Sequence, residues 1–156
     1  MTVKPIPDGY HSVTPYLIVK GAASAIEFYK KAFGASEIMR MAGPEDKVQH
    51  AEIQIGDSRV MLADECPEMN VLAPQGPGNS GVGICLYVED VDAIVGRAID
   101  AGAKVQRPLQ DQFYGDRSAT LEDPFGHVWT VATHIEDIAP DEIQRRMEDM
   151  MKQQGE

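Results

Sequence analysis

The chain has 156 residues, of which 43% are hydrophobic and 25% are charged, a balance typical of globular proteins and not of disordered or fibrous ones. Its 14 Lys and Arg stand against 25 Asp and Glu, so the net charge of −11 disfavours a nucleic-acid duplex or an anionic membrane surface as partner. No apolar run is long enough to span a bilayer, and the N-terminus lacks the basic and hydrophobic segments of a signal peptide. We therefore expect a cytoplasmic protein.

The first part of the chain, about residues 9–65, predicts a βαβββ module. A strand is expected over residues 12–19, which are rich in β-branched side chains. A helix is expected over residues 22–33, where apolar side chains recur every three or four positions and Gly34 follows. Three strands complete the module, over residues 35–41, 48–55 and 58–63.

The same order of elements returns after a connector over residues 66–80, which is rich in Pro and Gly. In the second module, about residues 81–134, Asp90 is a natural N-cap for a helix that Gly102 ends. Its strands are expected over residues 82–88, 103–109, 117–122 and 127–133, and a last helix over residues 140–153.

An offset of 69 residues relates the two modules. It carries Leu17, Val19 and Ile26 onto Leu86, Val88 and Val95. Because a single βαβββ unit cannot bury both faces of its sheet, two copies should share one core. The sequence therefore predicts one α+β domain, in which two βαβββ modules form an eight-stranded cupped mixed sheet with outer helices, plus a C-terminal helix.

Four motifs carry a resemblance to a known family. They are Thr14-Pro15-Tyr16-Leu17 leading into Ala25-Ile26-Glu27-Phe28-Tyr29; His50-Ala51-Glu52; Phe113-Tyr114-Gly115-Asp116-Arg117; and Asp123-Pro124-Phe125-Gly126-His127-Val128-Trp129 with Ala132-Thr133-His134. Over residues 9–151 the sequence resembles the vicinal oxygen chelate superfamily, also called the glyoxalase, bleomycin resistance protein and extradiol dioxygenase superfamily, and within it the PhnB-like branch.

Enzymes of this superfamily bind a divalent metal through ligands on the first and last strands of each module. The resemblance places these positions at Thr14, Met61, Gly83 and Thr130, and both pairs, Thr14 with Gly83 and Met61 with Thr130, differ by the repeat offset of 69. None of the four supplies the imidazole or carboxylate that such an ion needs. We therefore expect no metal and no other cofactor at these positions.

Strand alternation turns one set of side chains toward the helices and the other into the cup. The polar and aromatic residues expected to line the cup are Tyr16, His50, Glu52, Arg59, Tyr87 and Glu122. A packed core would not accept so many polar groups, because each unsatisfied one costs about 1 to 3 kcal/mol when buried. The pattern favours a ligand cavity.

His50 and Glu52 lie two positions apart on one strand and allow two interpretations. They could form an acid/base pair, or a displaced metal site with Glu122 as third ligand. They could also be a histidine hydrogen-bonded to a neighbouring carboxylate at the sheet surface, the interpretation that we favour.

Other candidates allow structural interpretations as well. Arg59, Asp116 and Arg117 could orient a polar or anionic ligand, or Asp116 and Arg117 could form a salt bridge that fixes the loop at the mouth of the cup. His134 is expected to be a surface or structural residue, and Trp129 is expected to pack against a helix.

Three hypotheses about function follow. The preferred one is a metal-free protein that binds a small organic molecule, similar to the antibiotic-sequestering members of the superfamily; the acidity of the chain favours a cationic ligand. The second is a metal-dependent lyase, isomerase or dioxygenase that uses His50, Glu52 and Glu122. The third is an interaction module with a filled cup.

The sequence leaves open whether the protein is an enzyme, and whether the modules pair within one chain or between two. We expect a homodimer, because superfamily members usually complete their cup across modules or subunits. The apolar stripe of the last helix, formed by Ile143, Met147, Met150 and Met151, offers area to bury.

Overall fold

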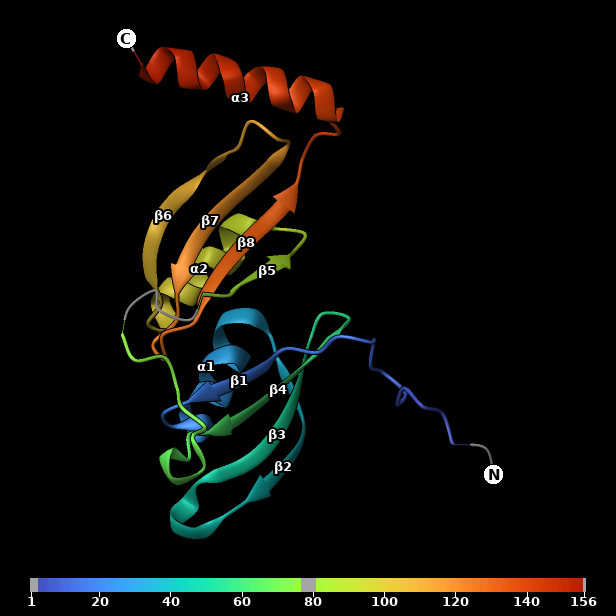
Figure 1. Cartoon of the computed structure of the whole chain (residues 1–156), viewed down its shortest axis with the longest axis vertical. Coiled ribbons are helices and arrows are strands. Elements are labelled where there is room, and N and C mark those ends of the chain that lie inside the picture. The colour runs from blue at the N-terminus through green and yellow to red at the C-terminus, as the bar shows by residue number, and fades with distance from the viewer. Residues whose placement is uncertain (1–2, 77–80, 156) are drawn as a thin grey trace.

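A computed structural model describes residues 3–76 and 81–155 of the chain. Its first module is a βαβββ unit whose sheet has the order β1-β4-β3-β2, with β1 parallel to β4 and the other pairs antiparallel (Figure 1). The elements are β1 (Tyr16–Val19), α1 (Ala22–Phe33), β2 (Ser36–Ala42), β3 (Val48–Ile55) and β4 (Ser58–Asp64).

The second module repeats this topology, with the sheet order β5-β8-β7-β6. Its elements are β5 (Gly83–Tyr87), α2 (Val91–Ala101), β6 (Lys104–Asp111), β7 (Asp116–Glu122) and β8 (Val128–His134), and α3 (Pro140–Gln154) follows. The predicted α+β fold with two βαβββ modules is confirmed. In the described part of the chain its eight strands are divided between two four-stranded sheets, and no ladder joins them.

The strand registers repeat the offset found in the sequence. Tyr16 pairs with Met61 in the first module, and Cys85 pairs with Thr130 in the second, so both strands shift by 69. Most element bounds agree with the prediction to within two residues. The first strand is shorter than expected, beginning at Tyr16 directly after Pro15, whose ring nitrogen cannot donate to a ladder.

Each module helix begins at a hydrogen-bond acceptor. Asp90 accepts from the amide of Ala93 at 3.2 Å, as expected of an N-cap. Before α1 the equivalent residue is Gly21, and Asp64 of β4 instead accepts from the amides of Gly21 and Ala22, both at 2.8 Å. The first helix is therefore capped from the end of its own sheet.

The two helices pack against each other and against one face of the sheets, and they join the modules through a shared core. Trp129 is 1% exposed and its ring lies 4.7 Å from that of Phe33 and 5.4 Å from that of Tyr29, between centroids. The expectation that Trp129 packs against a helix is confirmed. The opposite face of each sheet is left open.

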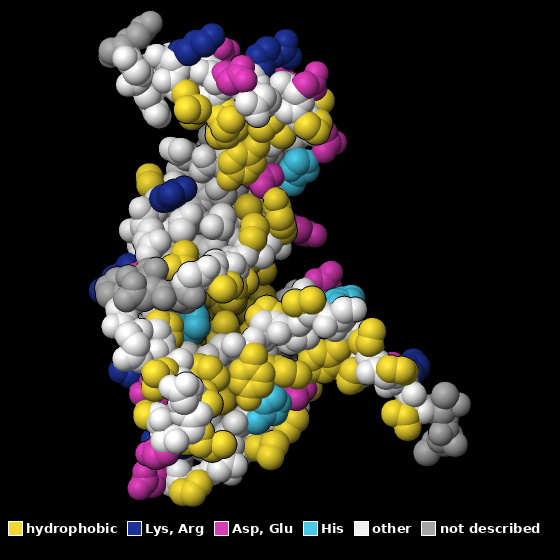
Figure 2. Space-filling model, in the orientation of Figure 1, with side chains coloured by type: hydrophobic (Ala, Val, Ile, Leu, Met, Phe, Trp, Pro, Cys, Tyr) yellow, Lys and Arg dark blue, Asp and Glu magenta, His cyan; other side chains and the backbone are white. Residues whose placement is uncertain are grey.

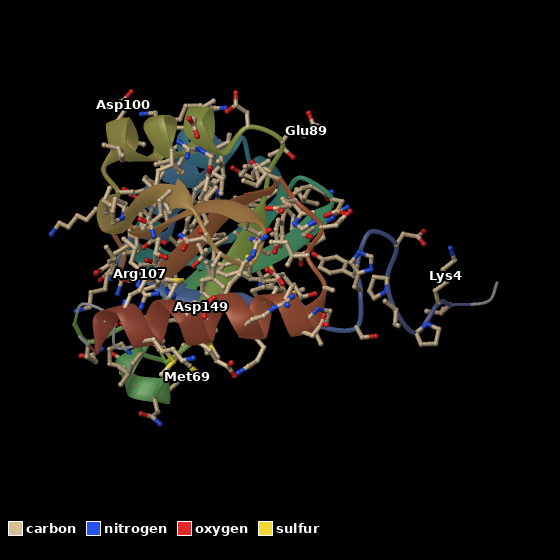
Figure 3. The ribbon with its side chains drawn as sticks, turned by 90° about the horizontal axis from the view of Figure 1, so that it is seen from above. Lys4, Met69, Glu89, Asp100, Arg107 and Asp149 are labelled. Atoms are coloured by element: carbon tan, nitrogen blue, oxygen red, sulfur yellow. The ribbon has the colours of Figure 1, made fainter. Side chains whose placement is uncertain are left out.

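Two segments lie apart from this core. The chain before β1 projects from the body at Lys4, and α3 lies at the far end of the second sheet, on the side opposite α2 (Figure 3). Arg146 ties α3 to the body by donating to the carbonyl of Phe113 at 3.1 Å. None of the helices formed by the described residues is both long and apolar enough to cross a bilayer.

Candidate functional site

A chain of hydrogen bonds crosses the open face of the first sheet. The Tyr16 hydroxyl lies 2.8 Å from Nδ1 of His50, and Nε2 of His50 lies 2.7 Å from Oε2 of Glu52. The other carboxylate oxygen of Glu52 accepts from the hydroxyl of Tyr10. We call these four residues, Tyr10, Tyr16, His50 and Glu52, the polar cluster.

Charge assigns the protons in the polar cluster. The hydroxyl of Tyr10 and then His50 lower the pKa of Glu52 below its ordinary value, so this carboxylate is ionised and accepts both bonds. Burial and Glu52 raise the pKa of Tyr10 to about 12, and the same two causes raise that of Tyr16. His50 therefore donates from Nε2 to the carboxylate of Glu52, and its Nδ1 is hydrogen-bonded to the hydroxyl of Tyr16.

Arg59 lies beside the polar cluster. Its guanidinium carbon is 5.3 Å from the centre of the Tyr10 ring, a cation–π distance. Gly9 lets the chain pass over it: Gly9 has a φ of +86°, and a Cβ there would lie 2.6 Å from Nη2 of Arg59. Nε of Arg59 is buried and has no hydrogen-bond partner among the described residues.

A cavity of about 820 Å³ lies between the modules and is lined by residues of β1 and β5. Hydrophobic side chains gather at this hollow in Figure 2. Its lining residues are Val13, Pro15, Tyr16, Leu17, Ile18, Leu72, Ala73, Pro74, Gln75, Val82, Gly83, Ile84, Cys85 and His127. Tyr16 connects this cavity to the polar cluster.

A smaller cavity of about 170 Å³ extends the first one. The two share Val13, Pro15, Ile84 and Cys85, and the smaller one is also lined by Arg59. Polar residues thus contribute to the walls of both cavities, Tyr16 to the larger one and Arg59 to the smaller one.

The structure brings together four of the six residues expected in the cup, namely Tyr16, His50, Glu52 and Arg59. Tyr87 and Glu122 lie on the second sheet: the hydroxyl of Tyr87 donates to Asp116 at 2.7 Å, and Glu122 accepts from Gln106 at 3.0 Å. Tyr10, which the sequence analysis missed, joins them instead. It lies in an irregular segment whose sequence has no period that would predict a contact with β3.

The residues at the usual metal positions of the superfamily do not suit a divalent ion. Thr14 precedes β1, Met61 lies on β4, Gly83 begins β5, and Thr130 on β8 has its hydroxyl 3.4 Å from that of Thr120. Hydroxyl, thioether and glycine are poor donors for zinc, iron or manganese.

The alternative ligand set is not assembled within one chain. Glu122 belongs to the second sheet, whereas His50 and Glu52 are bonded to each other on the first. Across residues 3–76 and 81–155, no three His, Cys, Asp or Glu side chains are grouped as metal ligands would be.

Of the two interpretations that the sequence allowed for Asp116 and Arg117, a salt bridge between them is wrong. Neighbouring strand residues face opposite sides of a sheet, so Arg117 instead pairs with Asp92 at 2.8 Å and with Asp111 at 3.0 Å. Asp116 is buried on the other face, where Tyr87 and His134 are its partners.

Comparisons with known proteins agree with this architecture. The family described as the Glyoxalase/Bleomycin resistance protein/Dioxygenase superfamily matches residues 9–131. An uncharacterized protein of Mycobacterium bovis is 44% identical over 139 residues, which cover 87% of this chain and 91% of that protein.

Two solved structures show the same fold. The crystal structure of TioX from Micromonospora sp. ML1 has a TM-score of 0.64 and 26% identity, covering 80% of this chain and 99% of that one. The PhnB protein of Bacillus cereus has a TM-score of 0.62 at 16% identity, covering 79% and 99%. From its matched sequence, its repeated βαβββ modules and these relatives, the chain belongs to the Glyoxalase/Bleomycin resistance protein/Dioxygenase superfamily.

Proposed function

We propose that this protein binds a small organic molecule in the cavity between its modules and does so without a metal at the usual positions of the superfamily. One observation carries the proposal: an apolar cavity of about 820 Å³ is lined by Tyr16, whose hydroxyl is hydrogen-bonded into the polar cluster. Ligand sites of proteins usually combine a mainly apolar wall with a few fixed polar groups, and their volumes fall in this range.

The polar cluster gives the cavity a preference for certain ligands. Glu52 is ionised, and both of its oxygens already accept hydrogen bonds, from Tyr10 and His50. A cationic group would therefore interact with Glu52 through the Tyr16 and His50 relay, or would replace Tyr10 on the carboxylate. Arg59 on the wall of the smaller cavity suits an acceptor oxygen of the same ligand.

A homodimer belongs to the same proposal. The open faces of both sheets carry exposed aromatic residues, Tyr16 at 46% and Tyr87 at 60% exposure, and on α3 Met150 and Met151 are exposed as well. A second copy would bury this apolar area. Sedimentation at micromolar concentration should give a dimer, and a monomer would remove this part of the proposal.

The two cysteines suit the proposed cytoplasmic location. Cys66 and Cys85 are both free, as is usual in a reducing compartment. A thiol-labelling assay of protein in intact cells, with a compartment-restricted reagent, would test this location directly.

The first experiment is native mass spectrometry of protein purified without a metal-affinity tag, because it reports copurified ligand, metal and oligomeric state together. A thermal-shift screen of cationic, neutral and anionic metabolites and antibiotics then identifies the class that stabilises the fold. One tightly held metal per chain, lost in His50→Ala, would favour the metal-dependent enzyme.

A matched pair of glycine variants tests the place of binding. A Cβ at Gly83 has no heavy atom nearer than 4.0 Å, so Gly83→Leu should place its side chain in the cavity and obstruct part of it. Gly96 on the exposed side of α2 has an equally open position away from the cavity and gives the control Gly96→Leu. The thermal shift should be lost only in Gly83→Leu; equal shifts in both variants would refute this cavity as the site.

A further inference from the structure

A second polar cluster lies on the other module, under the beginning of α3. Asp116 is 6% exposed and accepts from the Tyr87 hydroxyl at 2.7 Å and from Nδ1 of His134 at 2.8 Å. The other ring nitrogen of His134 lies 2.7 Å from Oδ1 of Asp137. These groups border a cavity of about 510 Å³, whose further walls are Tyr114, Ile138, Ala139 and Ile143.

Geometry fixes the charge of His134. Ionised carboxylates only accept hydrogen bonds, so a ring placed between two of them must carry a proton on each nitrogen. Asp116 is held by burial and by Tyr87, whereas the side chain of Asp137 is fully exposed, at 101% relative accessibility. The bond to Asp116 is therefore built into the fold, and the bond to Asp137 can be exchanged.

We propose that this cavity is a second ligand site, which takes a small organic acid with an apolar body. The carboxylate of the ligand replaces that of Asp137 on Nε2 of His134. Its apolar part lies against Tyr114, Ile138 and Ile143. Asp137 occupies the place of the ligand carboxylate when no ligand is bound.

The charges around the cavity agree with this assignment. Its titratable lining groups are Asp116, His134, Asp137, Tyr87 and Tyr114, so among these described residues His134 is the one cation. Arg146 of α3 is engaged elsewhere, with Glu142 and Glu136. When the carboxylate of the ligand replaces that of Asp137, the charge in contact with His134 does not change. At physiological salt, the negative charges of the rest of the chain are screened beyond about 8 Å.

The beginning of α3 contributes apolar surface to the cavity. Ala139, which precedes the helix, and Ile143 line it. The first turn of α3 carries the carboxylates of Asp141 and Glu142, so the helix supplies apolar contacts and His134 supplies the positive charge.

Binding should depend on pH through His134. The hydrogen bonds to Asp116 and then Asp137 raise its pKa above the ordinary value of 6.5. The imidazolium that receives the acid is present below the raised pKa and is lost above it. Affinity should therefore fall as pH rises through that value.

The test uses benzoate and hexanoate as probes, with benzamide and hexanamide as neutral counterparts. The NMR signals of the His134 ring are followed during titration at about pH 6. Both acids should shift these signals and bind about tenfold more tightly than the amides, because a hydrogen bond between two charged groups is stronger than one to a neutral acceptor.

Three variants test whether the acids bind at His134. Asp137→Asn removes the competing carboxylate at a fully exposed position, so folding is unaffected and the acids should bind about threefold more tightly or better. His134→Gln should weaken binding about tenfold or more, and the exposed control Asp100→Asn on α2 should leave it unchanged.

The proposal is overturned if neither acid moves the His134 signals in the wild type or in Asp137→Asn, or if acids and amides bind equally. In that case His134 only anchors the segment between β8 and α3. Gly83→Leu blocks the first cavity and leaves this one intact, so failure of the first site and failure of this one can be told apart.

Discussion

Asp123 is the residue whose replacement should destabilise the protein most clearly. Its Oδ2 accepts from the Tyr29 hydroxyl at 2.5 Å and from Nε1 of Trp129 at 2.9 Å. Its Oδ1 accepts from the amides of Phe125 and His127 at 2.9 and 3.0 Å. One buried carboxylate thus fixes the Asp-Pro-Phe-Gly turn of the second module and holds the first module's helix α1 through Tyr29.

The size of the stability loss follows from the hydrogen-bond donors that Asp123→Ala would leave without an acceptor. Tyr29 is 0% and Trp129 is 1% exposed, so water cannot replace the lost acceptor without a rearrangement of the core. Each buried donor left unsatisfied costs about 1 to 3 kcal/mol, which gives about 2 to 6 kcal/mol for the two side chains. Since a domain of this size is stable by about 5 to 15 kcal/mol, the variant should lose a large share of its stability.

The assay is urea denaturation followed by tryptophan fluorescence and circular dichroism. Trp129 is the single tryptophan of the chain, so its emission reports directly on this site. Tyr29→Phe removes one donor and leaves Asp123 paired with Trp129, and it should cost about 1 kcal/mol. Asp100→Ala changes an exposed carboxylate on α2 (Figure 3) and should stay within about 0.5 kcal/mol of the wild type.

The reasoning would be refuted if Asp123→Ala lost less than about 1 kcal/mol, or no more than Asp100→Ala. Either result would mean that Tyr29 and Trp129 find other acceptors. A crystal structure of the variant would then show which groups replaced the carboxylate.

Three further predictions concern the two polar clusters and the approach to α3. His134 has a raised pKa in the folded state, so the stability that it contributes is fully present below pH 6.5 and is lost as pH rises through the raised value. His134→Gln should therefore lower Tm at about pH 5.5 and hardly change it at about pH 9. Glu52 has a lowered pKa, so Glu52→Gln should cost about 1 kcal/mol at neutral pH, and this difference should vanish in acid as the wild-type carboxylate takes up its proton. Gly115 has a φ of +103°, and a Cβ there would lie 2.2 Å from the carbonyl oxygen of Glu136. Gly115→Ala should therefore lower Tm and displace α3. The control Gly96→Ala on α2 should raise Tm or leave it unchanged. An unaltered Tm in Gly115→Ala would contradict the close approach of these two segments.

Patterns in the sequence were enough to predict the helices and strands and the repetition of their order. Apolar spacing predicted α1 and α2, Asp90 and Gly102 marked the ends of α2, and the 69-residue offset reappears in the register of β1 with β4 and of β5 with β8. The helices and their ends depend on contacts between near neighbours, so a short window of sequence contains them, and the offset appears when the two halves of the sequence are compared.

The composition of the sites depended on tertiary structure. Tyr10 is 42 positions from Glu52, and Tyr29 is 94 positions from Asp123. Strand alternation correctly placed Tyr16, His50 and Glu52 on one face, but it could not show that Tyr87 and Glu122 belong to a different sheet. A strand's own sequence determines which side chains share a face, whereas the packing of α1 on α2 determines which faces and cavities the two modules bring together.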